Sequence, residues 1–168
     1  PGTYACAYPI TITGNLAVTG GPVQLFVNIL DPNASTTTDI DITAGSTVNY
    51  NGSVDASGKC VLSGTLPDAT QLQIFTNGAG LVGDSSGKGY CFGGILYAPN
   101  ASLTGNGCKS SYLGAVVINI FTCNGGPNLG FYYDNALKAL FGPWTTSGYT
   151  QIPPSTVQTA LQNPSYCC

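Results

Sequence analysis

The sequence predicts an all-β protein, a right-handed parallel β-helix (β-solenoid) that ends in a short C-terminal helical cap. The first observation is a repeat: residues 92–106 align with residues 112–126, and Tyr132 follows Tyr112 by another twenty positions. A fixed period of this size, filled with Gly, Asn, Thr and short apolar runs, is typical of chains in which each turn buries its inward side chains against the next turn.

The aligned positions indicate which side chains should stack. Three pairs fall in register: Phe92 with Tyr112, Gly94 with Gly114, and Leu96 with Val116. We therefore expect Phe92, Tyr112 and Tyr132 to form an aromatic ladder with about 4.8 Å between rungs. A sugar-binding platform is the alternative role for these rings.

The second observation is the composition, which favours sheets over disorder. Apolar residues make up 43 % of the chain and lie among Thr, Ser, Asn and Gly, whereas charged residues make up 7 %. A chain of 168 residues fits one domain that buries roughly two thirds of its unfolded surface. We divide residues 1–168 into an entry segment (1–20), a solenoid body (21–133) and a cap (134–168).

Short strands separated by turn signals are expected through the first half of the chain. Apolar and polar residues alternate at 8–15, 39–43 and 48–50. Further strands are expected at 21–28, at 60–62 and at 71–76. The strand at 60–62 follows a turn-rich stretch, and the strand at 71–76 ends at the turn signal Asn77-Gly78. A loop at 78–90 precedes the two aligned rungs.

The pattern changes to helical spacing near the C-terminus. Residues 134–141 begin with Asp134 as a candidate N-cap, and residues 155–162 follow Pro153-Pro154 with Ser155 or Thr156 as the cap. Because open solenoid ends expose unpaired backbone groups and apolar side chains, a terminal helical cover is expected there.

Charged residues are few and scattered. Seven Asp and four Lys, with no Glu, Arg or His, give a net charge of 4 − 7 = −3. Nucleic acid is not an expected partner, because phosphate binding needs clustered cations. No membrane span is expected, since the longest apolar stretch, 114–121, is far shorter than the roughly twenty residues required. Residues 1–20 show no signal peptide, so we expect a processed chain.

Seven cysteines are many for a cytosolic domain of this size, and none has the C-x-x-C spacing of a zinc or redox site. Together these two features indicate disulfide bonds and an oxidising, extracellular compartment. The disulfide candidates are Cys6, Cys60, Cys91, Cys108, Cys123, Cys167 and Cys168. Cys108 and Cys123 are the expected pair, because each lies at the turn end of a neighbouring rung. The odd cysteine is expected among Cys6, Cys167 and Cys168 at subunit contacts, with a vicinal Cys167–Cys168 bond as the alternative.

The sequence predicts no enzyme, no cofactor and no metal site. Without His, no Ser-His-Asp, Cys-His or haem-attachment arrangement can form, and the glycine-rich stretch 83–89 lacks Walker spacing. Asp39 and Asp41 have the spacing of two carboxylates on one strand face and are compatible with Ca²⁺. We expect instead that they solvate the outer face while Ile40 and Ile42 point inward.

Two further sets of polar residues have structural interpretations. Asp134 lies beside Phe131, Tyr132 and Tyr133, yet no second acid accompanies it, so helix capping is favoured over glycoside hydrolysis. Asn33, Asn51 and Asn100 begin Asn-x-Ser triplets and are candidate glycosylation sites, which matter only in an organism that glycosylates exported proteins.

Several segments together resemble a known family. They are residues 21–28, 71–78, 93–103, 113–117 and 132–137, of which 95–101 (Ile-Leu-Tyr-Ala-Pro-Asn-Ala) is the most specific. Over residues 20–137 the chain is similar to the uncharacterised β-helical domain at the C-terminus of bacterial PilX-type pilus-assembly and other surface proteins. The resemblance implies an exported, cell-surface setting and no established reaction. That family tends to have His-Tyr-Asp where this chain has Tyr132-Tyr133-Asp134, which argues against a His-based site.

These observations favour an extracellular structural protein that assembles with copies of itself into a surface filament, pilus-like appendage or layer. The alternative is an exposed adhesin domain of a pilus-associated protein, which would bind surface glycans or other pilus components. A β-helical polysaccharide lyase or hydrolase is disfavoured, because such a site needs clustered acids together with Arg or Lys.

Overall fold

The computed structural model describes residues 1–28, 38–84, 89–106, 109–124, 130–141 and 165–167. Most of these residues lie in strands: β1 (Gly2–Cys6), β2 (Ile10–Ile12), β3 (Asn15–Leu16), β4 (Val23–Val27), β5 (Thr38–Ile42), β6 (Thr47–Val48), β7 (Gly52–Val54), β8 (Cys60–Leu62), β9 (Leu72–Thr76), β10 (Leu81–Asp84), β11 (Cys91–Asn106), β12 (Ser111–Asn124), β13 (Gly130–Tyr132) and β14 (Ser165–Cys167). Two short helices, η1 (Ala69–Gln71) and α1 (Leu137–Phe141), complete the described elements. The predicted all-β class is confirmed.

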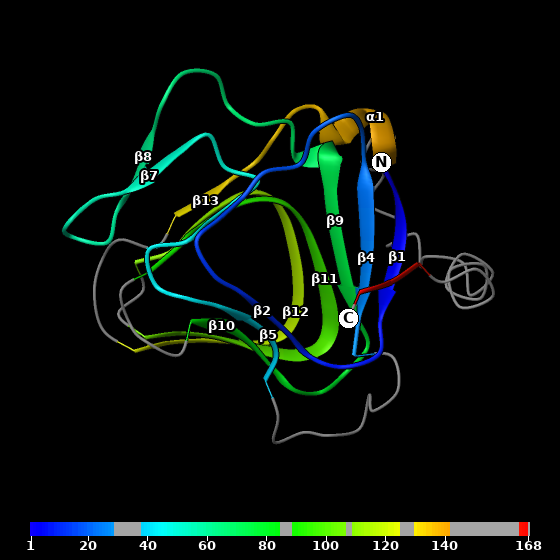
Figure 1. The fold of residues 1–168 in the computed structure, drawn as a ribbon. Coiled ribbons are helices and arrows are strands. Elements are labelled where there is room, and N and C mark those ends of the chain that lie inside the picture. Colours follow the sequence, from blue (N-terminus) through cyan, green and yellow to red (C-terminus); the bar gives the residue numbers. More distant parts are fainter. Residues whose placement is uncertain (29–37, 85–88, 107–108, 125–129, 142–164, 168) are drawn as a thin grey trace.

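Parallel pairing joins the strands into three ladders. The first runs β14-β1-β4-β9-β11-β12, the second β2-β5-β10-β11-β12, and the third β3-β6-β11-β12-β13. The long strands β11 and β12 belong to all three ladders and bend from one to the next, so the ladders surround a common interior (Figure 1). Among the described strands, β7 and β8 alone pair antiparallel.

The twenty-residue register is confirmed where β11 and β12 begin. Phe92 pairs with Tyr112, and this offset continues to Ala98 and Ile118. The ladder prediction is wrong by one residue at the next strand, because Tyr112 pairs with Phe131 while Tyr132 pairs with Leu113. Since successive side chains on a strand point to opposite faces, this slip removes Tyr132 from the aromatic row. Phe131 stacks on Tyr112 instead, with 5.1 Å between ring centroids.

The offset between β11 and β12 also changes at a corner. Beyond Ala98, the next paired residues are Ser102 and Ile120, so β11 uses three residues, 99–101, where β12 uses only 119. Pro99 cannot donate a backbone hydrogen bond, which favours an interruption of the ladder at this point. The fixed period expected for 92–106 therefore holds along one ladder and not around the corner.

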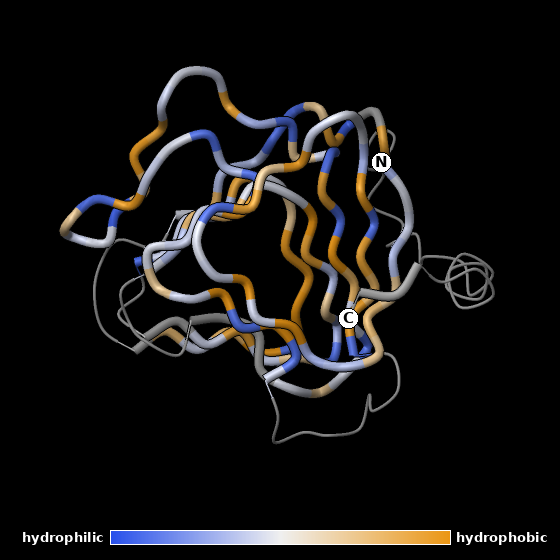
Figure 2. The backbone as a smooth tube through the Cα atoms, viewed as in Figure 1, coloured by the Kyte–Doolittle hydropathy of each residue, from blue (hydrophilic) through white to orange (hydrophobic). Residues whose placement is uncertain are grey.

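The core lies between the three ladders. Its buried side chains include Ile40, Val48, Ile74, Phe92, Leu96 and Leu103. Hydrophobic and hydrophilic residues alternate along the strands of the first ladder, as Figure 2 shows, because alternate side chains point toward the interior and away from it. On the outward side, Thr3, Gln24 and Gln73 hydrogen-bond to one another in succession across β1, β4 and β9.

Asp39 is buried, which corrects the expectation that it solvates the outer face of its strand. The pairing of β5 with β10 skips residue 39, since Leu81 pairs with Thr38 and Val82 with Ile40. Such a β-bulge breaks the alternation of side chains. The carboxylate of Asp39 accepts hydrogen bonds from the Asn28 amide at 2.6 Å and the Thr76 hydroxyl at 3.2 Å. Ile40 and Ile42 are buried as expected.

The expected C-terminal helical cap is not seen in the part of the chain that the structure describes. Helix α1 falls within the predicted 134–141, and Leu137 packs against Ala69, Ile95 and Ala115, beside the first ladder. Within the described ranges, no helix covers the end of the sheet at β12 and β13. The second predicted helix, 155–162, lies outside those ranges.

The sequence predicted Asp134 as an N-cap, but α1 begins only at Leu137, so the Asp134 side chain caps the turn that leads into the helix. One carboxylate oxygen accepts the Ala136 N–H and the other accepts the Ala69 N–H of η1, both at 2.9 Å. The Asp134 carboxylate therefore links the start of α1 to η1. Neither of the described helices is long and apolar enough to cross a membrane.

Candidate functional site

A hairpin formed by β7 and β8 projects from the parallel sheet (Figure 1). Its turn is organised by Asp55, whose carboxylate accepts the N–H groups of Ser57 and Lys59 and the Ser57 hydroxyl. These hydrogen bonds, led by that of the Ser57 hydroxyl, lower the pKa of Asp55. Gly58 closes the turn with a φ of 82°, a conformation that glycine adopts at no steric cost.

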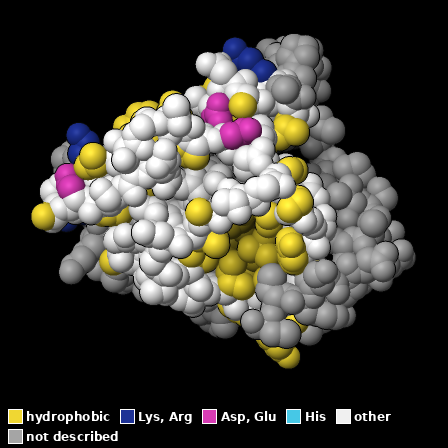
Figure 3. Space-filling model, turned by 45° about the horizontal axis from the view of Figure 1, so that its top comes forward, with side chains coloured by type: hydrophobic (Ala, Val, Ile, Leu, Met, Phe, Trp, Pro, Cys, Tyr) yellow, Lys and Arg dark blue, Asp and Glu magenta, His cyan; other side chains and the backbone are white. Residues whose placement is uncertain are grey.

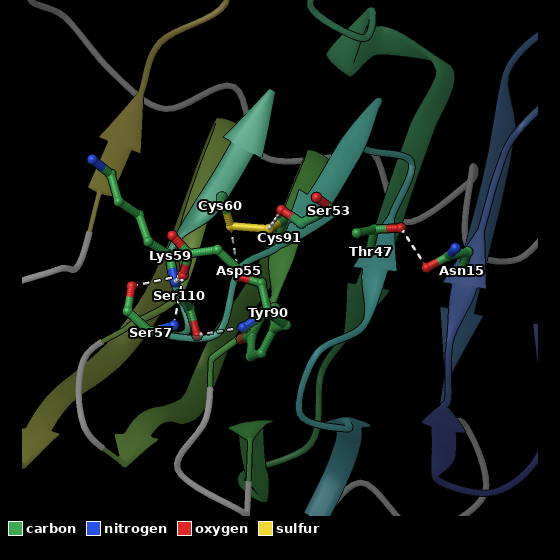
Figure 4. The surroundings of a disulfide bond; sticks show 10 residues. All are labelled: Asn15, Thr47, Ser53, Asp55, Ser57, Lys59, Cys60, Tyr90, Cys91 and Ser110. Carbon is green, nitrogen blue, oxygen red and sulfur yellow. Dashed lines mark hydrogen bonds between the residues drawn. A yellow bond between two sulfur atoms is a disulfide. The ribbon is translucent and has the colours of Figure 1, made fainter. Parts of the chain in front are cut away.

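A disulfide bond fixes the hairpin to the sheet. Cys60, the first residue of β8, is bonded to Cys91, the first residue of β11, over a sequence separation of 31 (Figure 4). Because Cys91 is fully buried and pairs with both β6 and β12, the disulfide joins the hairpin to the core of the sheet.

The remaining cysteines are only partly described. Cys123 is also in a disulfide bond. Cys108, its predicted partner, lies outside the described residues, so that pairing stays a prediction. Cys6 and Cys167 fall opposite each other in the parallel pairing of β1 with β14. That they lie at subunit contacts stays a prediction.

The space between the hairpin and the last strands forms a groove with a volume of about 680 Å³. We call it the aromatic groove, and its lining residues are Tyr50, Lys59, Cys60, Leu62, Leu66, Ser111, Leu113, Phe131, Tyr132 and Tyr133. Its size falls within the range of roughly 300–1,000 Å³ that is usual for small-molecule sites. Nothing in the linear sequence places residues 50–66 beside residues 111–133, and most of this groove was not predicted.

Three successive aromatic side chains form one wall of the groove. Phe131, Tyr132 and Tyr133 are 54, 59 and 46 % exposed, respectively. Single exposed hydrophobic residues are common, whereas a contiguous cluster marks an interaction surface. These rings stand out in the sequence because they lie next to Asp134, although the Asp134 carboxylate itself is used in capping. Trp144, which also lies nearby in sequence, is outside the described residues.

Tyr50 lies on the opposite wall. Burial raises the pKa of its phenol, and the nearby phenol of Tyr132 raises that pKa further. A side chain on Gly52 would clash with the Val61 carbonyl oxygen at 2.1 Å and approach the Tyr50 ring at 3.0 Å. Glycine at position 52 therefore allows β8 and the Tyr50 ring to pack closely, which gives the groove a defined wall.

Among the described residues that line the groove, Lys59 alone carries a charge. Its side chain extends away from the Asp55 turn, as Figure 4 shows. The Asp55 carboxylate is engaged by backbone N–H groups, including that of Lys59 itself. The groove thus combines aromatic rings, phenol and serine hydroxyls, and one ammonium group.

A second hollow, with a volume of about 530 Å³, lies along β12 and shares β13 with the groove. We call it the end face; its lining residues are Tyr112, Gly114, Val116, Ile118, Phe121, Phe131, Tyr132 and Tyr133. β13 pairs with β12 at 111–113 alone, so in the described chain residues 114–124 of β12 have a strand partner on one side only. An open strand edge beside apolar side chains is a template for further pairing.

The opposite end of the ladders is also open in the described residues. β2 and β3 each pair with one strand, β5 and β6, while β14 pairs with the outer edge of β1. Leu16 is exposed there, and Ile10 and Val18 are partly buried against the core. In the view of Figure 3, hydrophobic side chains gather in a hollow, and the few charged side chains lie toward the margins.

The other predicted sites do not form a common centre. Asn51 and Asn100 are exposed, and their amide groups hydrogen-bond to Thr65 and Asn77, respectively. Asn33 lies outside the described residues. No group of three or more His, Cys, Asp or Glu side chains suited to a metal ion occurs in the part of the chain that the structure describes.

A family model described as a domain of unknown function (DUF7305) matches residues 1–140. No curated protein and no solved structure matches the chain. The matched range contains the aromatic groove, the end face and all three ladders except for β14.

Proposed function

We propose that this chain, which belongs to the DUF7305 family, is an extracellular structural protein whose copies associate end to end into a surface filament, pilus-like appendage or layer. The observation that carries the proposal is that its parallel ladders stop with open strand edges at both ends of the described chain, beside apolar side chains. Unpaired backbone groups on such edges form hydrogen bonds readily with another chain.

The detailed class of the fold, beyond all-β, is part of the same proposal. Three parallel ladders, joined by strands that pass from one to the next, support a right-handed parallel β-helix in which each turn stacks on the preceding one. In this fold the end face of one copy and the β2–β3 end of another have the same strand direction and spacing. One copy therefore continues the ladders of its neighbour.

The symmetry of this contact favours a polymer. The end face and the β2–β3 end are different surfaces, so their contact is heterologous. A heterologous contact generates an open filament unless its rotation closes a ring. The apolar lining of the end face provides the hydrophobic burial that such a contact requires.

The extracellular setting rests on separate support. The Cys60–Cys91 bond and the bonded Cys123 fit an oxidising compartment, since structural disulfides are rare in the cytosol. The sequence resemblance to the β-helical domain of PilX-type surface proteins agrees with this setting and with other pilus components as partners. Neither argument requires catalysis, and the proposal includes none.

Sedimentation velocity and negative-stain electron microscopy test the self-assembly. The wild type should form concentration-dependent oligomers or filaments, and Phe121→Lys should abolish them, because it places a charge on the end face at a side chain that is 40 % exposed. Val61→Lys is the matched control, since Val61 is 45 % exposed but lies on the hairpin and lines neither hollow. A wild type that stays monomeric at every concentration would contradict the proposal.

A second candidate function is carbohydrate binding by an exposed adhesin domain. It is favoured by the aromatic groove, which places exposed rings and hydroxyl groups around one cavity. Phe131, Tyr132 and Tyr133 line both the groove and the end face, so self-assembly and carbohydrate binding would compete for these three side chains. Tyr50, Lys59, Leu62 and Leu66 line the groove alone.

A further inference from the structure

We propose that the aromatic groove binds an acidic carbohydrate, with Lys59 pairing with a sugar carboxylate and the tyrosine rings packing against the apolar face of the sugar. This inference rests on the second candidate function and specifies its ligand. It does not depend on self-assembly.

The shape of the groove suits a ligand that is apolar on one face and polar at its edges. Tyr132 and Tyr133 present both ring and hydroxyl, an arrangement suited to a surface that is apolar at one end and wet at the other. Sugar rings have C–H groups on their faces and hydroxyl groups around their rim. Ser111 and the tyrosine hydroxyls supply hydrogen-bonding groups for that rim.

The groove walls are held before any ligand arrives. The Cys60–Cys91 bond joins the hairpin to β11, and the Asp55 turn fixes the backbone of Lys59. On the other wall, Tyr132 pairs with Leu113 through the β13–β12 ladder. A site assembled in advance loses less conformational entropy on binding, which strengthens the affinity for a given set of contacts.

The charge of the groove selects the ligand class. Lys59 is the single ionised group among the described residues that line the groove. The Asp55 carboxylate, whose pKa is lowered by the Ser57 hydroxyl and also by the Lys59 charge, is engaged in the turn and lies outside that lining. An ammonium group beside low-polarity aromatic walls attracts an anion more strongly than it does in bulk water. One cation suits one carboxylate, whereas a nucleic acid backbone requires several. A sugar acid therefore fits better than a neutral sugar or a polynucleotide.

The test compares two ligands that differ in charge. Isothermal titration calorimetry would measure binding of an oligogalacturonate and of the same oligosaccharide with its carboxyl groups methyl-esterified. We expect the wild type to bind the acid more tightly, by about tenfold at low salt, with the difference shrinking as salt is added.

Two pairs of variants locate the binding. Tyr132→Ala should weaken binding of both ligands by about tenfold, the scale of one lost ring contact, whereas Tyr8→Ala, at a tyrosine that is 70 % exposed outside the groove, should change neither. Lys59→Gln should remove the preference for the acid, whereas Lys138→Gln, at an exposed lysine on α1, should preserve it. Thermal melting of each variant should match the wild type.

The possible results separate the inference from the function on which it rests. Equal binding of acid and ester, unchanged by Lys59→Gln, overturns the acidic ligand and leaves carbohydrate binding in place. If neither ligand binds at millimolar concentration, both this inference and the second candidate function fail. An acid preference that survives Lys59→Gln but is lost in Lys138→Gln places the site elsewhere and also overturns the inference.

Discussion

Glycine has a specific role at Gly94 and Gly114, which the sequence alignment placed in register. A Cβ on Gly114 would lie 2.0 Å from the Gly94 carbonyl oxygen, and Gly114 has a φ of 129°. A Cβ on Gly94 would approach the Leu72 carbonyl oxygen at 2.7 Å. Successive strands thus pass this point with no space for a side chain. The recurrence of glycine after twenty residues reflects this close approach.

We predict that Gly114→Ala lowers the free energy of unfolding by about 3 kcal/mol or more, since it combines backbone strain with a clash against a main-chain atom. Gly45→Ala separates the two effects: Gly45 has a φ of 76°, and a Cβ there would meet no atom within 4 Å. That variant should cost about 1 kcal/mol from conformation alone. Urea denaturation measures both, and equal losses for the two variants would show that the clash is relieved.

The burial of an individual side chain was harder to predict from the sequence than the alternation of apolar and polar residues along a strand. Alternation correctly predicted that Ile40 and Ile42 are buried, because each pairs within the second ladder. It failed for Asp39, because the bulge depends on how β5 pairs with β10, a strand far away in sequence. The prediction that Tyr132 continues the aromatic ladder failed for a similar reason. The residue that pairs with Tyr112 is Phe131, nineteen positions later instead of the expected twenty.

At the scale of elements, strands were predictable and corners were not. The expected strands at 60–62 and 71–76 correspond closely to β8 and β9, since apolar runs bounded by turn residues need little context. The partner of β8 was missed, because Gly52–Val54 holds a single apolar residue and lies among turn-forming residues, whereas β8 is an apolar run. The aromatic groove depends on that hairpin, and therefore only its three consecutive aromatic residues could be noticed from the sequence.

The disulfide at the base of the hairpin should contribute substantially to stability. Cys60 and Cys91 are separated by 31 residues, and closing a loop of that length restricts the unfolded chain by about 3–4 kcal/mol. We predict that the double variant Cys60→Ser/Cys91→Ser loses stability of this order in urea denaturation and binds carbohydrate more weakly.

Reductant provides the control for this prediction. It should destabilise the wild type more than the double variant, because the variant retains the disulfide that involves Cys123 but has already lost Cys60–Cys91. Equal effects of reductant on the two proteins would indicate that the hairpin disulfide contributes little to the folded state.

At the scale of the whole molecule, the two ends of the ladders differ. Within the described residues, β12 beyond residue 113 has an open edge at one end; at the other, β2 and β3 are open while β14 pairs with β1. The strand β14 therefore occupies the position on the first ladder where a neighbouring copy would add its own strand. In the assembly that we propose, pairing within the chain and pairing between copies would compete for the same edge of β1.

This competition yields a prediction about assembly. Tyr166 pairs with Ala5 in the β14–β1 ladder, and Tyr166→Pro removes a backbone donor and disfavours the strand. We expect release of β14, exposure of the β1 edge beside β2 and β3, and self-association at lower protein concentration in sedimentation velocity. Tyr166→Ala is the control, because it keeps the backbone N–H and should assemble like the wild type. If the proline variant assembles less readily than the alanine variant, then β14 supports the contact between copies instead of competing with it.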